Sequence, residues 1–387
     1  MEWKEVTLGD FMQCNPKRTI KKGQKARKIT MDLLIPHSKT IRNWNYEPYS
    51  GGAKFQNGDT IMARITPCLE NGKHAFVSIL DKGEIAYGST EYFVFCGKEE
   101  VSDNDFVYYL TKTPLFRDTA IKSMVGSSGR QRAQMDVLEN LKMLVPKDIS
   151  DQRRIASILS SLDRKIELNN KINADLEEMA QAIFKNWFVD FEPFKDGKFV
   201  DSELGMIPEG WKVGSLGDFC NVFTGKKNTN QAIEKGLYPF FSCAPEPLAS
   251  NDAIFNGKAI IIAGNGSYTG RTSFYNGGFD LYQRTYACTI REQDKENLMI
   301  FFYHMMKQFF EPTKMGGTRG SSIPYIVMGD ITQQKFPYSK DWLIRFSNIA
   351  NSMMDRKLRI DKENFRLSLL RDTLLPRLMS GELEVPE

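Results

Sequence analysis

Residues Asp151 to Phe194 read DQRRIASILSSLDRKIELNNKINADLEEMAQAIFKNWFVDFEPF and carry the strongest periodic signal in the chain. Mostly apolar positions recur there in alternating steps of four and three over about five heptads, as in a helix that packs along another helix. The pattern predicts one long helix over residues 151–190 with Asp151 as its N-cap. The seam positions are Ile155, Leu159, Leu162, Ile166, Asn169, Asn173, Leu176, Ala180, Ile183 and Trp187.

A second, less regular seam predicts another long helix near the end of the chain, in the region 341–387. Polar residues interrupt both seams, Asn169 and Asn173 in the first and Asp361 in the second. Such residues weaken a helix pair but fix its register, so the two helices are expected to pair with each other. The second seam runs up to Pro376 through Phe346, Ala350, Met354, Leu358, Phe365 and Leu369.

The chain also repeats itself, which indicates a duplicated unit. WKEVTLGDF at Trp3–Phe11 returns as WKVGSLGDF at Trp211–Phe219, and DRKI at Asp163–Ile166 returns as DRKL at Asp355–Leu358. GDTIMA at residues 58–63 is matched by GKAIII at residues 257–262. The order of the matches is kept, so each copy consists of a globular block followed by a long helix.

Each globular block is rich in predicted strands, with one short helical pattern, at 105–123 and at 295–310. The chain is therefore predicted to be α+β: two tandem α/β domains, each followed by a long helix. The expected boundaries are 1–150, 151–190, a linker at 191–210, 211–340 and 341–387. The predicted strands are Thr60–Ile65, Ala75–Leu80, Glu91–Cys96, Ala259–Ile262, Thr272–Tyr275 and Thr285–Ile290.

Composition excludes several classes of protein. The 387 residues, 41% of them hydrophobic, are typical of a globular protein with two or three domains. No apolar run is long enough for a membrane span and the first residues do not resemble a secretory signal, so a cytoplasmic protein is expected. The six cysteines are isolated and predict neither a zinc site nor a disulfide framework.

The net charge of +4 conceals two basic blocks, because residues 1–146 and residues 211–340 each carry an excess of four positive charges. A local excess of positive charge favours binding to DNA phosphates. Two Gly-rich loops at matched positions, GSSGRQR and GGTRGSS, add hydroxyl and Arg side chains that suit phosphates and base edges. The candidate DNA-binding residues are Lys17, Arg18, Lys21, Lys22, Lys25, Arg27, Lys28, Ser127, Ser128, Arg130, Gln131, Arg132, Lys226, Lys227, Tyr268, Arg271, Arg284, Thr318, Arg319 and Ser321.

No catalytic motif is present in the sequence. There is no methyltransferase cofactor loop, no Walker A sequence and no HExxH, and GNGSYTG at residues 264–270 has the wrong spacing for a dinucleotide loop. No catalytic and no metal-binding residue is assigned. A nuclease whose carboxylates meet only in the folded chain and a coiled-coil adaptor that binds proteins instead of DNA stay open as alternatives.

The three most specific segments resemble the specificity subunit of type I restriction-modification enzymes. They are Asp151–Phe194, the joint ELGMIPEGWKVGSLGDF at Glu203–Phe219, and LLRDTLLPRLMSGEL at Leu369–Leu383. The resemblance covers essentially the whole chain. It implies two target-recognition domains that each bind one half of a bipartite double-stranded DNA site, and two antiparallel helices that set the gap between the halves.

The resemblance also implies partners. The helices would dock two modification subunits, which bind S-adenosylmethionine and methylate adenine, and ATP-driven, Mg²⁺-dependent restriction subunits would join the full complex. This chain itself would need no cofactor. The expected docking residues on the helices are Arg154, Arg164, Lys165, Phe184, Trp187, Phe188, Arg356, Lys357, Leu375 and Arg377; Phe184, Trp187 and Phe188 suit the core of the chain equally well.

Overall fold

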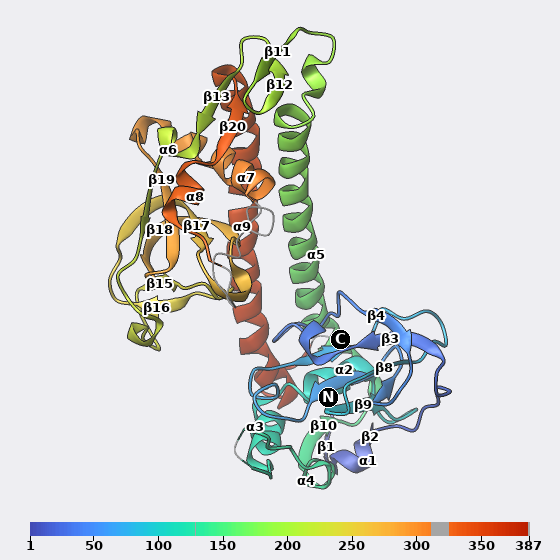
Figure 1. The fold of residues 1–387 in the computed structure, drawn as a ribbon. Coiled ribbons are helices and arrows are strands. Elements are labelled where there is room, and N and C mark those ends of the chain that lie inside the picture. The colour runs from blue at the N-terminus through green and yellow to red at the C-terminus, as the bar shows by residue number, and fades with distance from the viewer. Residues whose placement is uncertain (128, 311–324, 386–387) are drawn as a thin grey trace. The chain divides into compact units, whose positions relative to one another are not determined.

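The computed structural model describes residues 1–127, 129–310 and 325–385. The chain divides into two units, which we call unit 1 and unit 2 (Figure 1). Unit 1 comprises Met1–Lys171 and Asp361–Glu387, and unit 2 comprises Ile172–Ile360. Each unit therefore contains one globular block and part of each long helix.

Unit 1 is built on two four-stranded sheets, with strand orders β2-β9-β6-β7 and β4-β3-β8-β5. A separate antiparallel pair, β1 with β10, joins the beginning and end of the globular block. The strands are β1 (Trp3–Thr7), β2 (Met12–Cys14), β3 (Lys25–Ile29), β4 (Asn45–Pro48), β5 (Lys54–Phe55), β6 (Thr60–Ala63), β7 (His74–Phe76), β8 (Ala86–Gly88), β9 (Tyr92–Gly97) and β10 (Lys142–Pro146).

Short helices α1 (Leu8–Phe11), α2 (Asn104–Leu110), α3 (Pro114–Lys122) and α4 (Met135–Glu139) complete the globular part of unit 1, with the 3₁₀ turn η1 at Met31–Leu33. Helix α2 packs on β6, β7 and β9. Its last five residues, Phe106–Leu110, are fully buried in the core. The single helical pattern expected at 105–123 is two helices, because Pro114 cannot continue a helix and instead begins α3.

Unit 2 contains a six-stranded sheet of order β14-β19-β17-β18-β15-β16 and the antiparallel pair β13 with β20. Its strands are β13 (Lys212–Ser215), β14 (Cys220–Thr224), β15 (Tyr238–Phe241), β16 (Leu248–Ser250), β17 (Phe255–Ala263), β18 (Thr272–Leu281), β19 (Thr285–Ile290) and β20 (Lys335–Tyr338). Helices α6 (Leu216–Phe219), α7 (Met299–Phe309) and α8 (Met328–Thr332) and the 3₁₀ turns η3 (Thr229–Gln231), η4 (Gly266–Tyr268) and η5 (Gln293–Leu298) connect them.

The expected linker at 191–210 has structure of its own. A 3₁₀ turn, η2 (Glu192–Phe194), precedes a two-stranded hairpin of β11 (Phe199–Ser202) and β12 (Gly205–Pro208). The aromatic rings of Phe191 and Phe194 pack against Trp211 at centroid distances of 5.3 and 5.1 Å. Aromatic packing of this kind orders the segment within unit 2.

The two long helices are α5 (Ile149–Phe188) and α9 (Lys340–Met379), each of 40 residues. Forty residues give a helix about 60 Å long at 1.5 Å per residue. Helix α5 starts two residues before Asp151, so the prediction of Asp151 as N-cap is wrong; this residue lies in the first turn and is ion-paired with Arg154. Helix α9 passes through Pro376 and continues for three residues. In the described part of the chain, no helix is long and apolar enough to cross a membrane.

The helices pair antiparallel in each unit. In unit 1, Arg371 Nη1 lies 2.7 Å from Asp163 Oδ1 and Asn169 Nδ2 lies 2.9 Å from Asn364 Oδ1, so residue numbers fall along α9 as they rise along α5. In unit 2, Lys357 Nζ lies 3.0 Å from Glu177 Oε2. Asn169 therefore bonds across the helix pair, and its role in fixing the register stays a prediction.

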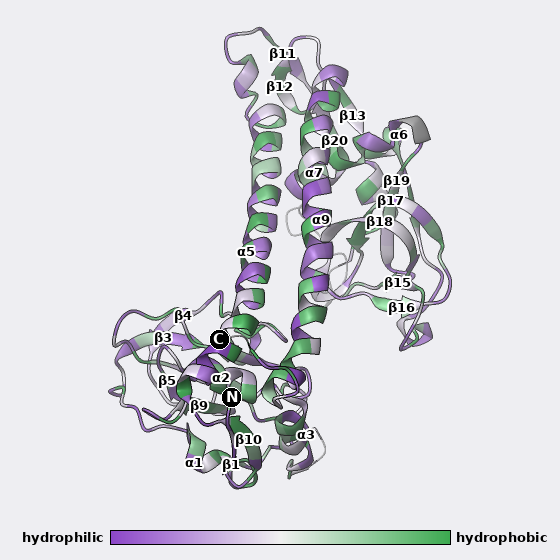
Figure 2. Ribbon diagram, turned by 180° about the vertical axis from the view of Figure 1, so that it is seen from behind, coloured by the Kyte–Doolittle hydropathy of each residue, from purple (hydrophilic) through white to green (hydrophobic). Residues whose placement is uncertain are grey.

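The seam of α9 differs from the predicted one. Phe346, Ala350 and Met354 are buried as expected, but Phe365 is 72% exposed and Leu369 is 60% exposed. In unit 1 the inward positions of α9 are taken by polar residues such as Asn364 and Arg371, which find partners on α5. Figure 2 shows the resulting alternation of hydrophobic and hydrophilic residues along α5 and α9.

Candidate nucleic-acid interface

In unit 1 the Gly-rich loop is tied to the end of strand β6. Arg132 pairs with Ile65 in an isolated bridge, Gln131 O accepts from Thr66 N at 3.0 Å, and Gln131 N donates to Thr66 Oγ1 at 3.1 Å. We call the described residues gathered here (Arg64, Thr66, Glu91, Gly126, Ser127 and Gly129–Arg132) the loop cluster of unit 1. These contacts hold the loop, which connects α3 and α4, against the residues that follow β6.

Two arginines in the loop cluster share one carboxylate. Arg132 Nη2 lies 2.8 Å from Glu91 Oε1, and Arg64 Nε lies 3.1 Å from Glu91 Oε2. The hydrogen bonds from Arg132, helped by Arg64 and opposed by desolvation, lower the pKa of Glu91. The carboxylate is therefore ionised at neutral pH and orients both guanidinium groups, and the three side chains keep one net positive charge.

The glycines of the loop are required by its geometry. Gly126 has a φ of +139°, and a Cβ there would lie 2.8 Å from Arg130 O. Gly129 has a φ of +77°, in the left-handed region that favours glycine. The resulting turn leaves Ser127 and Arg130 exposed. Ser128 lies outside the described residues.

Three cations of the basic run at residues 17–28 are bound within unit 1. Arg18 Nε donates to Asp59 Oδ2 at 2.9 Å, Arg27 Nη2 to Asp81 Oδ2 at 2.9 Å, and Lys28 Nζ to Glu47 Oε2 at 2.8 Å. The other four are exposed and form no ion pair within the part of the chain that the structure describes: Lys17, Lys21, Lys22 and Lys25. The free positive charge of the run therefore comes from its lysines.

Unit 2 repeats the backbone frame of the loop cluster. Arg64 N donates to Glu91 O in unit 1, and Gly264 N donates to Arg284 O in unit 2. Arg132 pairs with Ile65, and Tyr325 pairs with Asn265. Ala63 and Ala263 thus occupy equivalent places, one residue away from the match between 58–63 and 257–262 that the sequences suggest.

The side chains on this common frame differ between the units. Where unit 1 has Arg64, Glu91 and Arg132, unit 2 has Gly264, Arg284 and Tyr325. Arg284 is exposed, and its carbonyl and Asn265 Oδ1 accept hydrogen bonds from Cys243 Sγ at 3.3 and 2.9 Å. We call Cys243, Gly264–Tyr268, Arg284 and Tyr325 the loop cluster of unit 2.

The remaining candidates in unit 2 fall into two groups. Tyr268 is 49% exposed and Lys226 is exposed. Lys227 is instead paired with Asp252 and Asp280, both at 2.7 Å, and Arg271 donates to the carbonyls of residues 244 and 245. Lys227 and Arg271 therefore stabilise unit 2 itself. The candidates Thr318, Arg319 and Ser321 lie outside the described residues.

The expected docking residues on the helices are also divided. Phe184, Phe188 and Leu375 are buried, so the docking prediction is wrong for Leu375, and for Phe184 and Phe188 the alternative of a place in the core is the one observed. Phe184 and Phe188 stack at 5.1 Å in the core of unit 2, and Leu375 lies in the core of unit 1. Trp187 is partly buried and packs edge-on against Trp342 at 4.8 Å. For these aromatic residues the intramolecular alternative holds.

The charged docking candidates lie nearer the surface. Arg164 and Arg356 are exposed. The other four form ion pairs within their own unit: Arg377 with Glu382, Lys165 with Glu363, Lys357 with Glu177, and Arg154 with Asp151. Four exposed apolar side chains of the long helices in unit 1 were not among the expected docking residues: Leu168, Phe365, Leu369 and Leu370. Phe365 and Leu369 belong to the predicted seam, so the same periodicity marks them once the inward face is known.

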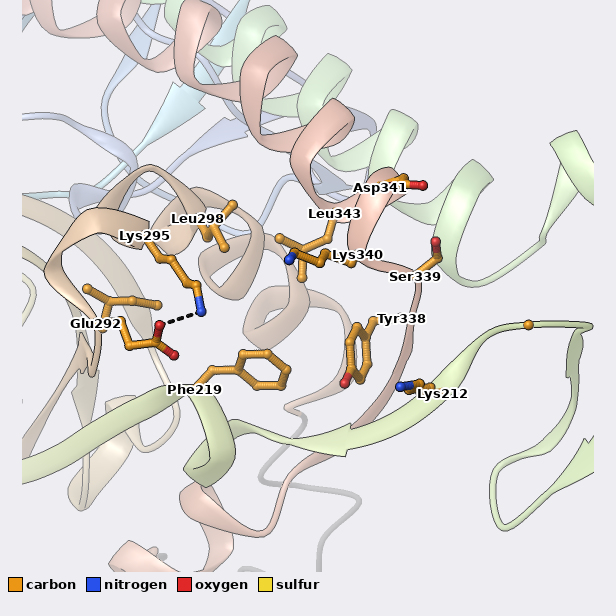
Figure 3. Close-up of a pocket in the computed structure, with 12 residues that line it drawn as sticks. Lys212, Phe219, Glu292, Lys295, Leu298, Tyr338, Ser339, Lys340, Asp341 and Leu343 are labelled. Carbon is orange, nitrogen blue, oxygen red and sulfur yellow. Dashed lines mark hydrogen bonds and ion pairs between the residues drawn. The ribbon is translucent and has the colours of Figure 1, made fainter.

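A separate cavity of about 430 Å³ in unit 2 lies at the start of α9 (Figure 3). Its charged groups nearly cancel, because three lysines face two carboxylates and Lys295 is paired with Glu292. The cavity therefore does not define an anion site. Its lining includes Lys212, Phe219, Ile290, Glu292, Lys295, Leu298, Tyr338, Lys340, Asp341 and Leu343.

Duplicated α+β units with equivalent loop clusters and paired long helices define a class of protein that has two similar binding domains. The family model described as "Type I restriction modification DNA specificity domain" matches residues 1–178 and 208–340. The chain therefore belongs to the family of type I restriction-modification specificity subunits. It is a non-catalytic, DNA-binding subunit of a complex that confers sequence specificity, and the adaptor alternative is not favoured.

Curated relatives carry the same description. The chain is 28% identical over 305 residues to the type I restriction enzyme MjaIX specificity subunit of Methanocaldococcus jannaschii, covering 73% of this chain and 70% of the relative. It is 24% identical to the HindI specificity subunit of Haemophilus influenzae, covering 99% and 100% of the two chains. A crystal structure of the S subunit from M. genitalium has the same fold, with a TM-score of 0.56, 16% identity and coverage of 98% and 96%.

Proposed function

We propose that unit 1 and unit 2 each bind one half of a bipartite DNA site through their loop clusters. The observation that carries this proposal is the common backbone frame with different side chains. A shared frame can approach DNA in the same way in both units, while different side chains read different bases. The site is therefore asymmetric, unlike the palindrome that a homodimer reads.

Contacts with the DNA backbone come from the charge of the clusters. In unit 1 the cluster has three arginines, Arg64, Arg130 and Arg132, against the single carboxylate of Glu91. Binding should therefore weaken steeply as salt rises, because phosphate contacts release counterions. The exposed lysines of the basic run extend the same contact surface.

Base reading falls to the side chains that no intramolecular contact immobilises. Arg130 projects from a glycine turn and is exposed, so it can enter a groove and bond to guanine. Arg284 and Tyr268 are the corresponding exposed groups in unit 2. Arg132 is bound to Glu91 and serves mainly to hold the loop.

The long helices dock the modification subunits and set the distance between the two half-sites. Two modification subunits dock on exposed helix residues, of which Arg164, Arg356, Phe365 and Leu369 are the strongest candidates. The fixed length of α5 and α9 sets the number of unread base pairs between the half-sites. S-adenosylmethionine, ATP and Mg²⁺ bind only to the partner subunits. The complex acts in the cytoplasm, where its DNA target lies.

The proposal is tested with variants in each cluster. The target is first determined from the methylated positions of host DNA, and the complex is then assayed on DNA with either half-site altered. Arg130→Ala should weaken recognition of one half and Arg284→Ala recognition of the other, each by about tenfold to a hundredfold at a directly read base pair. Equal losses at both halves for either variant would contradict the assignment.

A further inference from the structure

Unit 1 also has a concave site whose lining shares no residue with the loop cluster. A cavity of about 570 Å³ lies between β3 with the turn that precedes it, the residues around β4, and the loop at residues 81–85. This volume is typical of a site for a small organic group. Its walls combine exposed aromatic rings, an anchored guanidinium and hydrogen-bond acceptors.

Two aromatic side chains line this cavity. Trp44 and Tyr46 are 41% and 63% exposed. Trp44 immediately precedes β4 and Tyr46 lies within it, and both side chains line the same cavity. Every residue from Arg42 to Tyr46 is exposed, in the sequence RNWNY, which alternates aromatic and amide side chains. All five tryptophans lie in the described part of the chain, and Trp44 is the one that is exposed.

Arg27 holds the Trp44 ring in position. Its guanidinium carbon lies 4.8 Å from the ring centroid. The same guanidinium donates to Ile79 O and to Asp81 Oδ2, and its Nε lies 3.4 Å from Glu84 Oε1. A ring fixed by an anchored cation loses little freedom when a ligand stacks on it.

The floor and rim of the cavity add apolar contacts, hydrogen-bond acceptors and positive charge to the two aromatic rings. Ile20, Ala26 and Ile85 form an apolar floor, and the Asp81 and Glu84 carboxylates on the wall can accept hydrogen bonds from an exocyclic amine. Lys25 also lines the cavity, and the other exposed lysines of the basic run precede it closely in the sequence. Aromatic rings can stack on a base, carboxylates can accept hydrogen bonds from its amine, and adjacent lysines can contact the phosphates of the same strand.

We propose that this cavity binds a nucleobase that has left the stack of its DNA strand. A base within a duplex is covered on both faces and cannot enter a concavity, whereas an extrahelical base can place its face on Trp44 or Tyr46. This inference rests on the proposed DNA contact by unit 1. It adds a contact that depends on distortion of the half-site and is independent of the loop cluster.

The test compares the full-length chain on two duplexes that differ in one nucleotide. One duplex is fully paired, and the other carries a single unpaired 2-aminopurine, whose fluorescence reports stacking. The unpaired base should raise affinity about tenfold and its fluorescence should be quenched on binding. In the Trp44→Ala, Tyr46→Ala double variant both effects should disappear while affinity for the paired duplex stays unchanged.

Controls separate the possible outcomes. Trp44→Phe should keep the preference because it keeps a ring, and Phe365→Ala should keep it because that exposed ring lies on α9. A double variant that still quenches the unpaired base, or equal affinity for both duplexes, would overturn the inference and leave the proposed function standing. Failure to bind either duplex would overturn both, and strong competition by free dAMP would show that the site serves a free nucleotide instead of DNA.

Discussion

Arg371 of α9 and Asp163 of α5 form an ion pair inside unit 1, with Nη1 and Oδ1 separated by 2.7 Å and both side chains less than a tenth exposed. Asp163 also accepts a hydrogen bond of 2.6 Å from the Tyr109 hydroxyl of α2. This carboxylate therefore joins both long helices to the globular part of unit 1.

Removal of one partner of this buried pair should destabilise unit 1. Arg371→Met leaves the Asp163 carboxylate buried without its cation, which costs about 3–5 kcal/mol in free energy of unfolding. Urea unfolding monitored by circular dichroism measures the loss. Arg366→Met, at an exposed position of the same helix, is the control and should change stability by less than about 0.5 kcal/mol. Equal stability of both variants would contradict the assigned role of the pair.

Unit 2 should lose stability in acid. Burial alone would raise the pKa of Glu177, but hydrogen bonds from Lys307 and Tyr303 and the charge of Lys357 outweigh it and lower the pKa to about 2. Burial lowers the pKa of His304 to about 4. Both folded pKa values lie below the ordinary ones, so the unfolded chain binds more protons, and stability falls from pH 6.5 to 4 through His304 and from pH 4.5 to 2 through Glu177.

Thermal melting against pH checks this linkage. Glu177→Gln should flatten the profile below pH 4.5 and lower stability at pH 7 by about 2–3 kcal/mol, a figure reduced for solvent screening. Glu178→Gln, at the exposed neighbouring position, should leave the profile unchanged. A profile of the Glu177 variant that matches the wild type would refute the network.

The exposed apolar residues of α9 should matter for assembly and not for folding. Phe365→Ser and Leu369→Ser remove side chains that are 72% and 60% exposed, so the free energy of unfolding should change by about 0.5 kcal/mol or less. Co-purification with the modification subunit should fall strongly. Normal assembly of the double variant would show that the partner docks elsewhere.

Lengthening the helices should lengthen the gap in the target. Seven residues inserted after Lys171 in α5, with seven matching residues inserted before Asp361 in α9, add about 10 Å, which is the rise of about three base pairs. The methylated positions in DNA should then lie further apart, or binding should be lost. Unchanged spacing would remove the helices from their proposed role.

The long helices, the duplication and the α+β class could be predicted from the sequence, because seams and repeats are properties of the sequence itself. The inward face of α9 could not, because Asn364 and Arg371 turn inward only through partners on α5 that are far away in the sequence. Periodicity places an apolar stripe inside by default, which misplaced Phe365 and Leu369.

The loop cluster was predicted in part. Its Gly-rich loop has a composition that indicates close contact with DNA, but Arg64 and Glu91 are single charged residues in their sequence neighbourhood. Their pairing follows from the antiparallel register of β6 and β9, which sets Ala63 opposite Tyr92. Both residues lie at ends of predicted strands, so a correct strand pairing would have placed them together.

Hydroxyl-radical footprinting of the assembled complex on DNA that carries its target tests the central claim most directly. Two protected segments of different sequence, separated by an unprotected gap, are the predicted result. Arg130→Ala should weaken protection of one segment and Arg284→Ala protection of the other. One continuous or palindromic footprint, affected equally by both variants, would contradict the account.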